Sequence, residues 1–151
     1  MLAMSIAHNL ETVHQAIAKA ALAAGRAPHD VRLLAVSKTF GADAVIAAAE
    51  SGQIAFGENY VQEAVDKIAA VQSLRPDLHL EWHFIGPIQS NKTRTIAEHF
   101  DWVHAIDREK IAQRLSDQRP ATLAPLNICL QVNVSGEASK SGVAPEDLLP
   151  L

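Results

Sequence analysis

The sequence predicts an α/β fold built on parallel strands. Short apolar runs alternate with helical patterns four times, and a fifth apolar run follows them. Such alternation requires parallel strands joined by helical crossovers. An open doubly wound sheet satisfies this pattern, and so does a (β/α)₈ barrel, which needs eight strands and roughly 250 residues. Because the chain has 151 residues and about five strands are expected, either the sheet is open or the barrel is incomplete.

Cap and stop signals at the ends of 3.6-periodic stretches predict the helices. Ser5 can cap the first helix, and Gly25 can end it in a left-handed turn. Gly52 can end the second helix, while Ser90 and Asp107 are candidate caps for two later helices. The expected helices cover residues 5–25, 41–51, 58–71, 90–100 and 107–115, and a last one begins at Pro145.

Apolar runs predict five strands. Leucine, valine and alanine fill most of residues 31–39, which is typical of a parallel strand covered on both faces. This first strand ends at Lys38, where the chain passes into a loop. The other expected strands cover residues 54–57, 80–85, 102–105 and 127–133.

Composition narrows the class of protein. A net charge of −4 argues against nucleic-acid binding, which usually needs a basic face. No apolar run reaches membrane-spanning length, and the first residues lack the basic region of a signal peptide. Cys129 is the only cysteine, which excludes an intrachain disulfide. These features predict a cytoplasmic protein that binds neither membranes nor nucleic acid.

Lys38 lies where parallel folds bind ligands, at the carboxyl end of a strand. In a low-dielectric site a lysine loses its proton more readily, and its neutral amine can form a Schiff base with an aldehyde. The alternative is that Lys38 only extends its ammonium into solvent. The strand alone leaves both interpretations open.

Other strand ends also carry polar side chains, which a parallel sheet would bring to one edge. The usual nucleotide and serine-hydrolase motifs are absent from the sequence, and His79 and His83 lie too far apart along a strand to share a zinc ion easily, so no metal site is expected. The helix start at Ser90 can receive an anion through free backbone N–H groups. The polar groups at strand ends are Lys38 and Thr39, Glu58 and Asn59, residues 89–92, and Asn133 and Ser135.

Four motifs in this order resemble those of the pyridoxal phosphate homeostasis proteins, the YggS/PROSC family. The motifs are LLAVSK at 33–38, FGENYVQE at 56–63, WHFIGPIQSNK at 82–92, and QVNVSGE at 131–137 with Lys140 and Gly142. The resemblance implies an α/β fold of the (β/α)₈ TIM-barrel type, similar to the N-terminal domain of alanine racemase. It further implies pyridoxal 5′-phosphate bound to Lys38 as a Schiff base, with Asn59 near the cofactor ring and His83 and Ile85 lining the site.

The resemblance implies a cofactor carrier or buffer rather than an enzyme with robust turnover. It also implies that pyridoxal phosphate-dependent apo-enzymes receive the cofactor. Family members continue through three more βα units, which hold the phosphate-binding loops. We therefore expect residues 1–151 to form a single partial barrel domain with an extra N-terminal helix, truncated at the C-terminus. A full-length form is expected to be a monomer and the short form to associate. The alternatives are a racemase-like enzyme that uses the same cofactor and a fragment that does not bind it.

Overall fold

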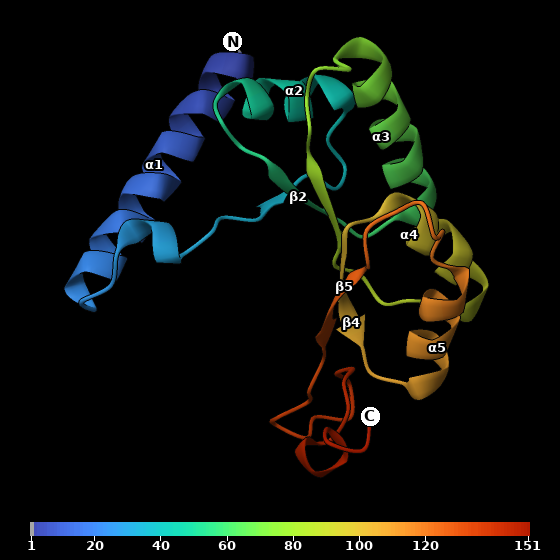
Figure 1. Ribbon diagram of the computed structural model, residues 1–151. Coiled ribbons are helices and arrows are strands. Elements are labelled where there is room, and N and C mark those ends of the chain that lie inside the picture. Colours follow the sequence, from blue (N-terminus) through green and yellow to red (C-terminus); the bar gives the residue numbers. More distant parts are fainter. Residues whose placement is uncertain (1) are drawn as a thin grey trace. The chain divides into compact units, whose positions relative to one another are not determined.

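The strands form one five-stranded sheet in the order β1-β2-β3-β4-β5 in the computed structural model, which describes residues 2–151 (Figure 1). Helices separate successive strands, as expected of an α/β fold with parallel strands. The predicted α/β class with five strands is therefore confirmed. The strands are β1 (Ala35–Val36), β2 (Ala55–Glu58), β3 (Glu81–Phe84), β4 (Trp102–Ile106) and β5 (Asn127–Leu130).

The chain forms two compact units. The first runs up to Phe56 and includes Asp66–Leu80, and the second consists of Gly57–Val65 and Glu81–Leu151. The expectation of a single domain over residues 1–151 stays a prediction. No helix in residues 2–151 is long and apolar enough to cross a membrane.

The first unit begins with helix α1 (Leu2–Ala23), which contacts the short helix η1 (Pro28–Asp30) and helix α2 (Ala42–Glu50). Gly25 has a φ of +72° and ends α1, as predicted. The prediction that Ser5 caps α1 was wrong, because the helix begins at Leu2 and Ser5 lies inside it. The good helix formers that precede Ser5 extend the helix toward the N-terminus.

Strand β1 is shorter and less covered than predicted. Only Ala35 and Val36 are in the sheet, and the Val36 side chain is 49% exposed, so the strand is not covered on both faces. Just before the strand, the Leu33 carbonyl accepts a hydrogen bond from the side-chain amide of Gln53 at 2.8 Å. This carbonyl is therefore satisfied by a side chain, which is one reason that the ladder does not extend to Leu33.

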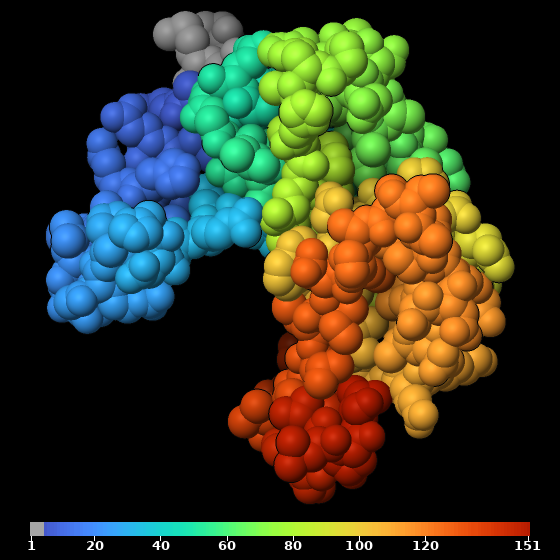
Figure 2. Space-filling view, viewed as in Figure 1, coloured from blue at the N-terminus to red at the C-terminus, as the bar shows by residue number. Residues whose placement is uncertain are grey.

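The second unit contains a parallel ladder covered by helices. His83 pairs with Trp102 and Phe84 with Val103, while β5 continues the sheet beside β4. The rings of Phe84 and Phe100 meet edge to face at 5.3 Å. Helices α4 (Thr93–His99) and α5 (Glu109–Gln118) pack against each other, and Figure 2 shows the atoms of this region in yellow and orange. The buried core here includes Phe84, Ile96, Phe100, Val103, Ile111 and Leu115.

Two predicted helix caps in this unit were wrong. Ser90 is the first residue of a short 3-10 helix, η2 (Ser90–Lys92), and Gln89 occupies the cap position without a side-chain hydrogen bond. Helix α5 follows Arg108, and the Asp107 carboxylate instead accepts a hydrogen bond from the Gly142 N–H at 3.2 Å. A distant loop has therefore taken the acceptor that a local cap would have used.

The end of the chain also differs from the prediction. Strand β5 stops at Leu130, earlier than the predicted residue 133, and Val132 forms a single parallel bridge with Val143. The segment that starts at Pro145 is a 3-10 helix, η3 (Pro145–Asp147). The helix α3 (Val61–Leu74) begins just after the predicted start at residues 58–60.

Candidate functional site

Lys38 lies in a tight turn directly after β1. The turn is closed by a hydrogen bond in which the Phe40 N–H donates to the Ser37 carbonyl at 3.1 Å. The Lys38 side chain is exposed, so the burial expected of a low-dielectric lysine site is not observed within residues 2–151. An exposed primary amine at the end of a strand is accessible to a soluble aldehyde.

Thr39, the next residue, has an unusual backbone. Its φ is +67°, in the left-handed region that β-branched residues rarely adopt. Such a conformation persists only where the surrounding structure enforces it, and it is frequent at functional sites. The strained backbone of Thr39 therefore makes the turn that carries Lys38 a candidate part of a functional site.

Lys67 of α3 is a second lysine at this turn. Its side chain is only 6% exposed, and its Nζ donates to the Ser37 carbonyl at 2.8 Å. Lys67 lies outside the four sequence motifs and was not among the predicted site residues. Its spacing was a usable signal, because Lys67 lies three residues after Ala64 and four before Val71, and both are buried.

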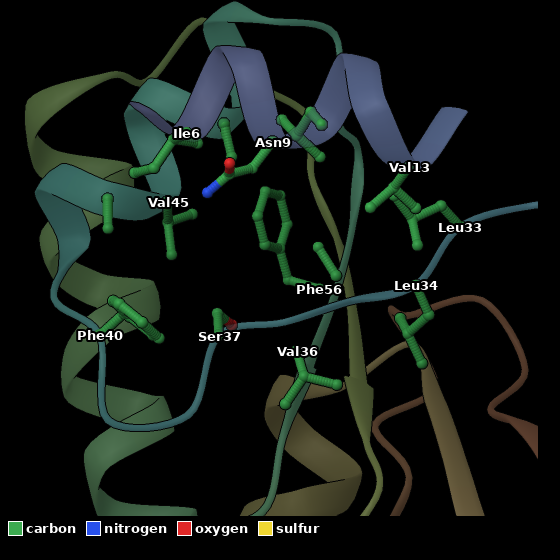
Figure 3. Close-up of a pocket in the computed structure, with 14 residues that line it drawn as sticks. Ile6, Asn9, Val13, Leu33, Leu34, Val36, Ser37, Phe40, Val45 and Phe56 are labelled. Atoms are coloured by element: carbon green, nitrogen blue, oxygen red, sulfur yellow. The ribbon is translucent and has the colours of Figure 1, made fainter. Parts of the chain in front are cut away.

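The turn also borders an apolar pocket of about 300 Å³ in the first unit. Ser37 and Phe40, the two ends of the turn, line it together with apolar side chains of α1, β1 and α2. In Figure 3, Asn9 of α1 points into this pocket above the ring of Phe56. Both end residues of the turn that carries Lys38 therefore border this apolar pocket.

In the second unit, the structure brings Asn59 and Ile85 to neighbouring strand ends. The Ile85 N–H donates to the carbonyl of Glu58 at 2.8 Å, and Gly86 lies against the backbone of Asn59. The side-chain oxygen Oδ1 of Asn59 is buried, and no hydrogen-bond partner for it occurs within residues 2–151. Because a buried acceptor without a donor is costly, this atom is suited to a donor supplied by a ligand.

His83, the third predicted residue of this unit, has both ring nitrogens engaged. Its Nε2 donates to Glu81 Oε1 at 2.7 Å, and its Nδ1 lies 2.8 Å from Nε2 of His104. The His83 ring also stacks on Trp102, with centroids 5.5 Å apart and planes 4° apart. Burial, and then the neighbouring His83, lower the pKa of His104 from its ordinary value. These contacts explain why His83 is buried, and its predicted role in lining the cofactor site stays a prediction.

The loop at Ser90 is held by protein contacts through a carbonyl oxygen, and the predicted anion site on its backbone N–H groups stays a prediction. The Ser90 carbonyl accepts hydrogen bonds from Thr93 Oγ1 at 3.1 Å and from Arg114 Nε at 3.0 Å. Arg108 adds a hydrogen bond to the Ile88 carbonyl at 3.2 Å. The two arginines of this region therefore fix the loop that follows β3.

Comparison with known proteins identifies the family. The model of the family described as alanine racemase, N-terminal domain, matches residues 4–151. The chain belongs to the alanine racemase N-terminal domain family. This assignment agrees with the resemblance drawn from the four sequence motifs.

Curated relatives within this family carry a functional name. The pyridoxal phosphate homeostasis protein of Pseudomonas aeruginosa is 66% identical over 144 residues, which cover 95% of this chain and 61% of the relative. The protein of the same name from Escherichia coli is 58% identical over 143 residues, which cover 95% of this chain and 61% of the relative. The chain thus spans less than two thirds of the length of these relatives.

Solved structures of similar chains include two informative neighbours. PipY of Synechococcus elongatus, solved with pyridoxal phosphate bound, matches with a TM-score of 0.74 and 38% identity, covering 96% of this chain and 62% of PipY. An unknown protein from Bifidobacterium adolescentis matches with a TM-score of 0.89 and 31% identity, covering 99% of this chain and 63% of that chain. These likenesses support the barrel type of the α/β fold.

Proposed function

We propose that this chain binds pyridoxal 5′-phosphate through a Schiff base on Lys38 and carries or buffers the cofactor in pyridoxal phosphate homeostasis. The observation that carries the proposal is the exposed Lys38 in a strained turn at the end of β1. The curated names of the relatives and the cofactor bound to PipY support the same cofactor. The cytoplasm is the expected location.

The chemistry of several side chains in this chain suits pyridoxal phosphate. The aldehyde of pyridoxal phosphate condenses with a primary amine and releases one water, and Lys38 provides an accessible amine. Asn59 Oδ1 is a buried acceptor that suits a hydroxyl or N–H donor of the ring. Gly86 packs directly against Asn59, where a Cβ atom would clash, and Ile85 offers a half-buried apolar side chain next to this contact. We also propose that His83, on β3, lines the cofactor site.

An exposed lysine suits a carrier. An imine protects the aldehyde and still exchanges with the amine of another protein, so pyridoxal phosphate-dependent apo-enzymes are the expected recipients. A racemase would need a positioned acid–base group on the other face of the cofactor. Tyr60, the one tyrosine in the sequence, is 55% exposed at the start of α3. This exposure favours the carrier over the racemase-like alternative.

Reductive trapping tests the attachment. Incubation with pyridoxal phosphate, reduction with borohydride and peptide mass spectrometry should place the label on Lys38. Lys38→Arg should remove that label while far-ultraviolet circular dichroism stays unchanged, because a turn at a strand end accommodates the longer side chain. Lys19→Arg, on the exposed face of α1, is the matched control and should leave the label in place. Label spread evenly over surface lysines would contradict the proposal.

A racemisation assay separates carrier from enzyme. We expect no conversion of L-alanine to D-alanine above the rate of free pyridoxal phosphate. Turnover well above that rate, and lost in Lys38→Arg, would instead support the racemase-like alternative.

A further inference from the structure

Lys67 is a charged side chain buried in the first unit. It lies on the face of α3 that also carries Ala64 and Val71, and it is 6% exposed. Burying an ammonium is unfavourable unless hydrogen bonds replace its lost hydration. One acceptor of its Nζ is the carbonyl oxygen of Ser37, at 2.8 Å.

The same carbonyl closes the turn that contains Lys38. The Ser37 oxygen accepts the Phe40 N–H at 3.1 Å as well as the Lys67 ammonium, so both of its lone pairs are used. Lys38 and Thr39 are the two central residues of this turn, and Thr39 holds the unfavourable φ of +67°. A turn with this strain requires an anchor outside itself.

We propose that Lys67 is a positioning residue, which holds the turn through the Ser37 carbonyl and thereby fixes the backbone of Lys38 for reaction with the aldehyde. A charge-assisted hydrogen bond is stronger than a neutral one, which explains a lysine at a helix position that packing alone would fill with an apolar residue. The chemical part of this inference, the effect on the reaction of Lys38 with the aldehyde, rests on the proposed function. Its structural part, the anchoring of the turn, stands without any cofactor.

Amide hydrogen exchange in the absence of cofactor tests the structural part. In Lys67→Met, the Phe40 amide should exchange about ten-fold faster or more, because a hydrogen bond to a charged group is lost and each tenfold corresponds to about 1.4 kcal/mol. Lys19→Met, which removes an exposed lysine from α1, should leave Phe40 exchange unchanged. Equal exchange at Phe40 in Lys67→Met and Lys19→Met would overturn the anchoring.

A measurement on the unmodified chain covers the case in which substitutions at Lys67 prevent folding. The Lys67 ammonium protons should exchange with water slowly enough to give a resolved ¹⁵N–¹H signal, unlike those of the exposed Lys19. A Lys67 ammonium that exchanges as fast as that of Lys19 would overturn the proposal.

Borohydride trapping tests the chemical part. After a short exposure to pyridoxal phosphate, the fraction labelled at Lys38 should fall about ten-fold in Lys67→Met and remain unchanged in Lys19→Met. Lys67→Arg, which keeps the charge and the donors, should recover part of the labelling. Unchanged labelling in Lys67→Met, with faster Phe40 exchange, would overturn the positioning role. Absence of specific label in the wild-type chain would count against the proposed function. The hydrogen-exchange result at Phe40 would still test whether Lys67 anchors the turn.

Discussion

A Cβ atom at position 86 would lie 2.8 Å from the Cβ of Asn59 and 3.0 Å from the Asn59 carbonyl oxygen. Real Cβ atoms essentially never approach another carbon so closely, and two of the nearest atoms belong to the backbone. Residue 86 is therefore glycine because the loop after β3 passes directly against the residue that follows β2. Asn59 is also the residue whose buried Oδ1 has no hydrogen-bond partner within residues 2–151.

Gly86→Ala should destabilise the chain. The added methyl group must displace the backbone of Asn59, and overpacking of this kind costs about 1–3 kcal/mol. Chemical denaturation followed by tryptophan fluorescence would measure the free energy of unfolding. Gly41→Ala is the matched control, because its Cβ would also lie at 2.8 Å, but from the carboxylate of the exposed Asp43, which can rotate away. Equal losses in the two variants would contradict the close approach.

Thr39→Gly should stabilise the chain but reduce the reaction of Lys38 with pyridoxal phosphate. Glycine adopts a φ of +67° without strain, and we expect a gain of up to about 1 kcal/mol in the free energy of unfolding. The turn becomes more flexible, so the borohydride-trapped fraction at Lys38 should fall. Thr39→Ala also lacks the hydroxyl but keeps a Cβ, and should not be stabilised. A gain in Thr39→Ala equal to that in Thr39→Gly would show that the backbone conformation is not the cause.

The free energy of unfolding should depend on pH through His104. Burial and the neighbouring His83 lower the pKa of His104 below its ordinary value of 6.5, so the unfolded chain binds this proton more readily than the folded chain. The stabilisation from neutral His104 is present above about pH 6.5 and is lost as the pH falls through that value toward the lower folded pKa.

His104→Gln should reduce this loss of stability on acidification, measured as the free energy of unfolding between pH 7.5 and pH 5. Substitution of the exposed His14 by glutamine should leave the pH dependence unchanged. The same loss of stability in His104→Gln as in the wild-type chain would exclude His104 as its source.

The outer strand β5 should promote association. It is last in the strand order, and its Ile128 and Leu130 side chains are 48% and 41% exposed. Exposed apolar edge strands pair with other chains, and a charge on the edge opposes this. Sedimentation velocity should therefore show less self-association in Ile128→Lys than in the wild-type chain. Leu22→Lys, which adds the same charge to α1 at a 65% exposed position, should not have this effect. Monomeric wild-type chain at high concentration would contradict the prediction.

The order of elements could be predicted from the sequence because its signals are local. Apolar runs and 3.6-residue periodicity placed each strand and helix, and Gly25 marked the end of α1 because a left-handed residue is needed there. The position of Lys38 just after β1 follows from the same local pattern. Its attachment to a cofactor, and the roles of Asn59, His83 and Ile85, came from resemblance and stay predictions.

Only the tertiary structure decided which polar groups meet. Asp107 had the chemistry of a helix cap, but the Gly142 N–H lies close enough in space to donate to its carboxylate. Gln53 satisfies the carbonyl of Leu33, twenty residues away, and Lys67 that of Ser37, thirty residues away. A hydrogen bond depends on distance and direction within about 3 Å, and hydrophobic periodicity contains no such information about side chains from separate elements. The sequence by itself therefore determined where Lys38 lies along the chain, and only the packing of α3 beside its turn brought the Lys67 ammonium to the Ser37 carbonyl.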